Sequence, residues 1–127
     1  MKTILLVEDN ERLTNALATL LRQSGYRVLT AFDGLYGVSM ALRHKPDLLV
    51  LDVAMPAGGG FSVAERVRRR SEVEVPIIFL SGRTEPGFRR RATGLGAAAY
   101  LEKPIDPDVL LTAIEEALKE SRAGAAA

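Results

Sequence analysis

Five short apolar segments divide the sequence, and longer stretches with helical patterning separate them. Three of the segments are continuous runs of leucine, isoleucine, valine or phenylalanine rather than alternations of apolar and polar residues. Continuous runs are typical of strands covered on both faces, which occur mainly in parallel sheets. The last segment is weaker, as an edge strand could be. The five segments are TILLV (3–7), RVLTA (27–31), DLLVL (47–51), PIIFL (76–80) and AAYL (98–101).

Between these segments, apolar residues recur at the spacing of one helical face. The first helix is expected to begin after Asn10, a good N-cap, and to stop at Gly25, which suits a left-handed position. In the last helix, Asp106 is expected to be the cap and Pro107 the first helical residue. The stripes are Leu13, Ala16, Leu17, Leu20 and Leu21; Leu35, Val38, Ala41 and Leu42; Phe61, Ala64 and Val67; and Leu110, Leu111, Ile114, Ala117 and Leu118.

A fourth helix between residues 83 and 95 is expected to be short or mobile. Pro86 and Gly87 limit its start, and Gly94 and Gly96 weaken its end. Five strands that alternate with five helices indicate a doubly wound α/β fold with right-handed crossovers. In such a sheet, ligands bind beyond the carboxyl ends of the strands.

The length of 127 residues fits one domain, and no linker is evident before RAGAAA (122–127). We therefore expect a domain over residues 1–121. Residues 122–127 would be a frayed helix end, a cloning remnant or the start of a linker. The chain has no cysteine, which excludes disulfides and cysteine-based metal sites. The N-terminal apolar run is too short for a signal peptide or a membrane span, which favours a cytoplasmic protein without a membrane contact.

The charge pattern does not indicate a nucleic-acid partner. The net charge is +1, whereas nucleic-acid-binding domains usually carry a larger basic excess and a recognisable reading element. Basic residues cluster in ERVRRR (65–70) and FRRR (88–91), which we interpret as solvated helix faces. The single histidine, His44, is interpreted as a surface residue at a helix end.

Polar side chains stand where four of the predicted strands end. Glu8 and Asp9 end the first strand, Asp52 the third and Ser81 the fourth, and Lys103 comes after the fifth. These groups are expected to converge at one edge of the sheet. Three carboxylates that meet repel one another unless a cation joins them, and oxygen ligands without histidine or cysteine suit Mg²⁺. One carboxylate could then attack phosphorus while the ammonium and hydroxyl groups bind phosphoryl oxygens.

Each of these residues alone has an ordinary structural explanation. An aspartate at a strand end is usually a turn or cap residue, a serine after a buried strand is usually an N-cap, and a Lys-Pro pair is ordinarily a loop. Their joint occurrence at successive strand ends favours one functional site over four separate explanations.

Four segments carry a resemblance to a known family: LLVEDN, PDLLVLDVAMP, PIIFLSG and GAAAYLEKPI. In this order and spacing, the sequence over residues 2–121 resembles the CheY-like receiver domain of bacterial two-component response regulators. The resemblance implies a flavodoxin-like fold with strand order 2-1-3-4-5. It also implies a signalling switch that catalyses only its own phosphorylation and dephosphorylation.

At the matching positions, the family implies a phosphoacceptor with a magnesium site. Asp52 would take a phosphoryl group from the phosphohistidine of a sensor histidine kinase or a phosphotransfer protein. The ion would be held by Glu8, Asp9, Asp52 and the backbone carbonyl of Ala54, with Glu8 acting through water.

The family also implies how the phosphoryl group is sensed. Ser81 and Lys103 would contact it, and the Lys103–Pro104 bond would be cis, which proline permits. Tyr100 would turn inward when Ser81 is drawn toward phosphate, although packing of a half-buried edge strand explains this tyrosine equally well. The surface that changes would comprise the fourth helix, fifth strand and fifth helix.

The sequence departs from the family pattern in two places. The loop MPAGGGFSV lacks the usual Asp-Gly, and its three glycines predict a loose segment that orders on phosphorylation or partner contact. AAA precedes Tyr100 where acids are frequent, which leaves the arginines at 89–91 less compensated. Arg83 and Ala54 are expected to flank the path of water to the phosphorylated site.

Other functions remain open from the residues. One alternative is an interaction module of the same fold that signals without phosphorylation. Another is an aspartate-nucleophile phosphatase or transferase, although Ala54 stands where that class usually has a second aspartate. Dinucleotide binding is disfavoured, since no glycine-rich turn follows the first strand. The output would be a downstream effector protein or a missing output domain, and the domain would be a monomer or a phosphorylation-dependent dimer.

Overall fold

The computed structural model describes residues 1–55, 59–70, 74–82 and 86–126, with side chains described as far as residue 121. Strands and helices alternate along this part of the chain. The strands are β1 (Thr3–Val7), β2 (Arg27–Ala31), β3 (Leu48–Asp52), β4 (Ile77–Ser81) and β5 (Ala99–Glu102). The helices are α1 (Glu11–Gln23), α2 (Gly34–His44), α3 (Gly60–Arg70), α4 (Pro86–Gly94) and α5 (Pro107–Ala126).

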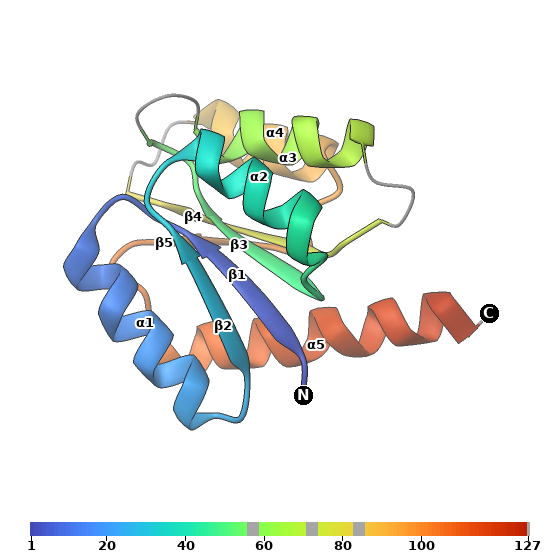
Figure 1. Cartoon of the computed structure of the whole chain (residues 1–127). Coiled ribbons are helices and arrows are strands. Elements are labelled where there is room, and N and C mark those ends of the chain that lie inside the picture. The colour runs from blue at the N-terminus through green and yellow to red at the C-terminus, as the bar shows by residue number, and fades with distance from the viewer. Residues whose placement is uncertain (56–58, 71–73, 83–85, 127) are drawn as a thin grey trace.

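The five strands form one parallel sheet in the order β2-β1-β3-β4-β5, as predicted. Helices α1 and α5 cover one face, and α2, α3 and α4 cover the other (Figure 1). The outer strand β5 is only partly buried, whereas every residue of β3 and β4 is buried. The continuous apolar runs therefore correspond to strands that are buried on both faces of the sheet.

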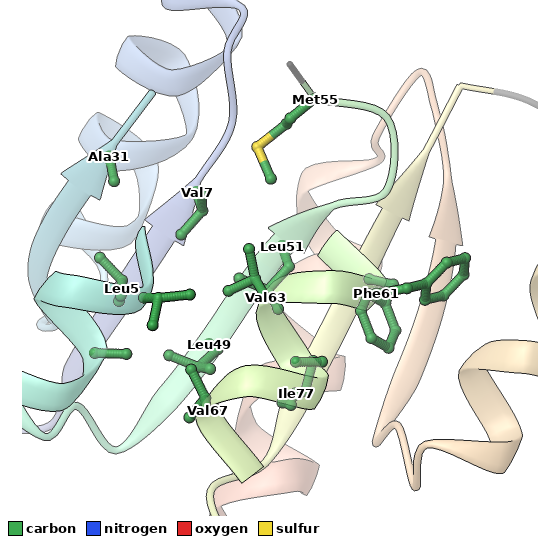
Figure 2. Packing of buried hydrophobic residues seen from close by; sticks show 14 of the residues in the cluster. Leu5, Val7, Ala31, Leu49, Leu51, Met55, Phe61, Val63, Val67 and Ile77 are labelled. Carbon is green, nitrogen blue, oxygen red and sulfur yellow. The ribbon is translucent and has the colours of Figure 1, made fainter. Parts of the chain in front are cut away.

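Alternate residues of each strand supply two separate cores. Leu5, Val7, Leu49 and Leu51 pack with α2 and α3 in one cluster, which Figure 2 shows together with Val63 and Val67 of α3. The intervening strand residues pack against α1 and α5 in the other cluster: Ile4, Leu6, Leu48, Val50, Ile78 and Leu80. The sheet thus separates two cores, and the period-two alternation of side chains decides which core a residue joins.

The predicted capping residues at both ends of α1 and at the start of α5 are confirmed. The Asn10 side chain accepts a hydrogen bond from the Leu13 N–H at 3.1 Å, and Gly25 has a φ of 95°. The Asp106 side chain accepts from the Asp108 N–H at 2.9 Å, and Pro107 is the first residue of α5. Helix α4 is short, as expected, with 9 residues. None of the helices in the described part of the chain has the length and apolar character of a membrane span.

Two expectations need correction. Asp52 and Ser81 end β3 and β4 as predicted, but β1 ends at Val7, so Glu8 and Asp9 follow the first strand rather than end it; β3 to β5 also each begin and end one residue later than the apolar runs. Leu35 was expected in the core, but its side chain on the first turn of α2 is 60% exposed and lines a hollow between α2 and α3.

Helix α5 continues to Ala126, so the backbone of residues 122–126 extends the last helix. The division of the chain after residue 121 stays a prediction. Arg83 and the loop residues 56–58 lie outside the described part of the chain.

Candidate functional site

The polar residues that end or follow the strands meet at the carboxyl edge of the sheet. Val7 pairs with Leu51 in the β1–β3 register, which brings Glu8 next to Asp52. On the other side, Ser81 pairs with Glu102, so Lys103 follows directly beside the end of β4. The order β1-β3-β4-β5 therefore places the acids on one side of Asp52 and the hydroxyl and ammonium groups on the other.

Local hydrogen bonds fix Glu8 at this edge. Its N–H donates to the Ala31 carbonyl at 3.0 Å, and its own carbonyl accepts from the Thr14 hydroxyl at 3.1 Å. The carboxylate accepts from the Asn10 N–H at 3.0 Å. Asn10 thus caps α1 with its side chain while its backbone holds the Glu8 side chain. Sequence reasoning missed this role of Thr14, which occupies a buried position that an apolar residue would otherwise fill.

Three carboxylates converge at this point. One oxygen from each of Glu8, Asp9 and Asp52 lies within 4.8 Å of the others. Glu8 and Asp52 are buried, at 0% and 2% exposure, whereas Asp9 is exposed. The Lys103 ammonium approaches from β5, with its Nζ 2.6 Å from Glu8 Oε1 and 3.4 Å from Asp52 Oδ1. The expected convergence of Glu8, Asp9, Asp52 and Lys103 is therefore present.

Burial dominates the electrostatics of the cluster. Burial, followed by the negative charge of Glu8, raises the pKa of Asp52 to about 7, although Lys103 and the Ala54 N–H counteract this rise. Burial lowers the pKa of Lys103, but its close ion pair with Glu8 and the charge of Asp52 outweigh that effect and raise the pKa above its usual value. The lysine stays charged, and the pKa of Asp52 shows that one ammonium does not fully compensate the buried carboxylates.

The donor set fits a hard divalent cation. All three side chains offer carboxylate oxygens, which Mg²⁺ prefers, and one of them is exposed so that an ion can enter. Glu8 Oε1 is buried and accepts no well-aligned hydrogen bond, although the Lys103 ammonium lies close to it. An acceptor of this kind has coordinating capacity left. The acidic triad can therefore bind a metal ion.

The residues after Asp52 stay close to it. The Ala54 N–H points at Asp52 Oδ1 at 3.4 Å, and the Gly60 N–H donates to the Val53 carbonyl at 3.2 Å. A Cβ on Gly60 would stand 2.6 Å from the Asp52 carbonyl oxygen. Gly60 therefore permits the close approach of α3 to β3, a different role from the looseness that the glycine run predicts.

Ser81 and Tyr100 lie on the far side of Asp52. Ser81 is buried, and its carbonyl accepts from the Lys103 N–H at 2.8 Å. The Lys103–Pro104 bond is cis, as expected. Tyr100 is half-buried, and the Arg89 guanidinium lies 4.8 Å from the centre of its ring and 3.3 Å from Glu102. The Arg89–Tyr100 contact was not predicted, because sequence spacing does not show which arginine of α4 faces β5.

Comparison with known proteins adds an independent result. Residues 4–115 match the model of the response regulator receiver domain family. The transcriptional regulatory protein DltR of Streptococcus agalactiae is 37% identical over 118 residues, which cover 93% of this chain and 52% of DltR. The alkaline phosphatase synthesis transcriptional regulatory protein PhoP of Bacillus subtilis is 35% identical over 124 residues, or 98% of this chain and 51% of PhoP. The chain thus spans about half the length of these curated relatives.

Solved structures show the same architecture. A CheY-like response regulator receiver domain protein from Methanospirillum hungatei superposes with a TM-score of 0.92 at 25% identity, covering 98% of both chains. The chemotaxis protein CheY4 of Vibrio cholerae gives a TM-score of 0.86 at 30% identity, covering 92% of this chain and 98% of CheY4. With its family match, strand order and acidic cluster at the carboxyl edge, this chain belongs to the response regulator receiver domains, the phosphoacceptor modules of two-component systems.

Proposed function

We propose that the chain is a phosphorylation-controlled switch in which Asp52 accepts a phosphoryl group from the phosphohistidine of a sensor histidine kinase or a phosphotransfer protein. The observation that carries this proposal is the meeting of Glu8, Asp9 and Asp52 within 4.8 Å, with the Lys103 ammonium 3.4 Å from Asp52. A carboxylate, two further acids and one ammonium are the groups that such a transfer needs in one place.

Each residue of the site has a separate role in the proposed phosphoryl transfer. The Asp52 carboxylate forms the new phosphorus–oxygen bond while the phosphorus–nitrogen bond of the donor breaks and the imidazole leaves with the bonding electron pair. Lys103 neutralises a phosphoryl oxygen, and the Ser81 hydroxyl, at the end of the neighbouring strand, donates to another. Glu8, Asp9, Asp52 and the Ala54 carbonyl would hold Mg²⁺. When bound, the ion supplies charge neutralisation between the acids and the incoming phosphoryl oxygens.

The proposed output is a change in the surface of α4, β5 and α5. Ser81 would move toward the phosphoryl group, and Tyr100 would turn into the space that the hydroxyl leaves. Helix α4 packs little against the sheet, because Ala92 is its only buried residue in the described part of the chain. It is therefore the helix with the least packing to resist displacement. Coupling of this kind usually amounts to about 1–3 kcal/mol.

The biological setting follows from the relatives. The names of several relatives describe transcriptional regulatory proteins, and this chain spans about half of their length. We propose that the receiver, over residues 1–121, passes its signal to an output domain or an effector protein, with residues 122–127 as a tail or linker. It would act in the cytoplasm without contacting nucleic acid or membrane itself, as a monomer or a phosphorylation-dependent dimer.

The test is phosphorylation by a small phosphodonor with Mg²⁺, followed by intact-mass measurement. Addition of one phosphoryl group is expected for the wild-type protein and none for Asp52→Asn. Asp108→Asn, which removes an exposed carboxylate at the start of α5, is the control and should be phosphorylated normally.

Other outcomes would identify the alternatives. Wild-type protein that takes no phosphoryl group from the small donor or from a histidine kinase would favour an interaction module that works without phosphorylation. Turnover of a phosphorylated metabolite would favour a phosphatase or transferase. A phosphoryl group that persists in Asp52→Asn would place the acceptor elsewhere.

A further inference from the structure

Helices α2 and α3 lie side by side on one face of the sheet (Figure 1). Side chains of both helices line a groove between them. The groove has a volume of about 590 Å³. One wall belongs to α2 and contains the exposed Leu35, the part-buried Leu42 and the buried Val38, together with Ser39 and Arg43. The opposite wall carries two arginines of α3, Arg66 and Arg70, one helical turn apart. The groove thus combines an apolar side with a basic side.

Apolar surface at the start of α2 is exposed. Phe32, Leu35 and Tyr36 are 47%, 60% and 51% exposed. Among the described residues, only Met1 and Val109 join them as exposed large hydrophobic side chains. Scattered single residues of this kind need no explanation, but these three lie within five positions, so exposed apolar side chains are concentrated at the start of α2. Leu35 also lines the groove, so part of this exposed apolar surface borders it.

The basic residues of the groove lack acidic partners within the described part of the chain. Other arginines of α3 and α4 are paired: Arg68 with Glu74, Arg69 and Arg91 with Glu65, and Arg89 with Glu102. No described ion pair involves the three arginines that line the groove, which are Arg43, Arg66 and Arg70.

The spacing of these charges also has a cost. Arg66 and Arg70 are four residues apart on α3, and like charges at this spacing disfavour a helix. An anionic partner in the groove would relieve that repulsion and complement Arg43 from the other wall.

The shape of the groove selects among anionic partners. Leu35, Val38 and Leu42 follow helical spacing over two turns, or roughly 10 Å. Leu42 and Arg70 also line a second hollow of about 640 Å³ toward the amino edge of the sheet, so the two hollows adjoin. A groove with an apolar wall accepts the apolar stripe of a helix. A flat membrane surface would not fill it, and the chain's net charge of +1 gives little attraction for nucleic acid.

We propose that the α2–α3 groove is a docking site for an acidic amphipathic helix of a partner protein. The apolar stripe of the partner helix contacts Leu35 and the exposed part of Leu42, and its acidic flank pairs with Arg43, Arg66 and Arg70. This site does not require phosphorylation of Asp52. The docking proposal can therefore be tested independently of the phosphorylation switch proposed above.

The test uses a synthetic helical peptide with leucines at helical spacing and glutamates on the flanks. A second peptide has the same leucines but lysine in place of each glutamate. Binding to the ¹⁵N-labelled protein is followed by backbone amide shifts. The acidic peptide is expected to shift amides of residues 35–43 and 63–70, with an affinity that falls as salt rises. The basic peptide is expected to leave those amides unchanged.

Surface variants locate the site. Arg66→Glu combined with Arg70→Glu is expected to weaken binding by about tenfold or more, because it both removes attraction and adds repulsion. Leu35→Ser should also weaken it. Arg90→Glu, which reverses an exposed arginine of α4 outside the groove, is the matched control and should leave the affinity unchanged. All of these side chains except Leu35 are charged surface groups, and Leu35 is itself mostly exposed, so the variants should fold.

Several results would overturn the proposal. They are equal binding of the two peptides, amide shifts confined to other surfaces, and the same affinity in the double arginine variant and in Arg90→Glu. Duplex DNA and vesicles of phosphatidylcholine with phosphatidylglycerol are titrated in parallel. If either of them binds through Arg66 and Arg70 while the acidic peptide does not, the groove is not a helix-docking site.

Discussion

Replacement of Asp52 by asparagine is expected to stabilise the protein at alkaline pH when divalent cations are removed. Asparagine has nearly the shape of aspartate and can still accept the hydrogen bond from the Ala54 N–H, but it carries no charge. In the wild-type protein, burial and Glu8 raise the pKa of Asp52 from 3.8 to about 7. The folded state therefore retains a proton that the unfolded chain has already lost, and the free energy of unfolding falls as pH rises from about 4 to about 7.

The pKa values set the size of this effect. A rise from 3.8 to about 7 corresponds to at most about 4 kcal/mol of lost stability above pH 7. The edge of the sheet is open to solvent, and the neighbouring Lys103 is 25% exposed, so the charges are partly screened. We expect the free energy of unfolding of Asp52→Asn to exceed that of wild type by about 1–3 kcal/mol at pH 8. Near pH 4 the two proteins should be about equally stable.

The measurement is urea unfolding at several pH values with a chelator present, followed by circular dichroism. The difference between the two proteins should grow with pH and level off above pH 7. Addition of Mg²⁺ at pH 8 should reduce it, because the wild type has one more carboxylate ligand to gain from the ion. A variant that is no more stable than wild type at pH 8, or a difference that does not change with pH, would refute the assigned electrostatics of the cluster.

Three further predictions concern the frame of the site. Gly60→Ala should destabilise the fold by about 1–3 kcal/mol, because the added Cβ would stand 2.6 Å from the Asp52 carbonyl oxygen. The control, Gly87→Ala, has open space around the added Cβ and should be neutral or slightly stabilising. Urea unfolding midpoints of the two variants are compared. Asn10→Ala should cost about 1 kcal/mol in the same assay by removing the cap of α1. Asp9→Asn should weaken Mg²⁺ binding on the order of tenfold without loss of fold, as titration calorimetry would show.

The sheet was predictable because its signal is local. Residues 48–51 are fully buried, and a continuous apolar run indicates such a strand without any knowledge of its neighbours. The caps at Asn10 and Asp106 are likewise decided by residues within one turn. The convergence of polar groups followed from topology, since the carboxyl ends of neighbouring parallel strands share one edge.

Features that depend on distant contacts were not predictable. Helical periodicity placed Leu35 on the apolar face of α2, but it does not show that this side chain stays exposed beside the groove between α2 and α3. The glycine at position 60 indicated a loose loop, whereas the structure uses it for close packing against β3. The 2.6 Å approach of Lys103 to Glu8 joins residues 95 positions apart, and sequence reasoning assigned that ammonium to a phosphoryl oxygen only.

The contact between Lys103 and Glu8 leaves negative charge at the site that a second cation, in addition to the lysine, would neutralise. Three carboxylates against one ammonium leave two negative charges at the edge of the sheet once Asp52 is ionised. Lys103 lies nearer to Glu8 than to Asp52, so its positive charge mainly neutralises Glu8, which is fully buried. Asp52, the proposed nucleophile, is left with a pKa of about 7, and a divalent ion would cancel the two remaining charges. Metal binding and ionisation of Asp52 should therefore favour each other, since each becomes easier when the other has occurred.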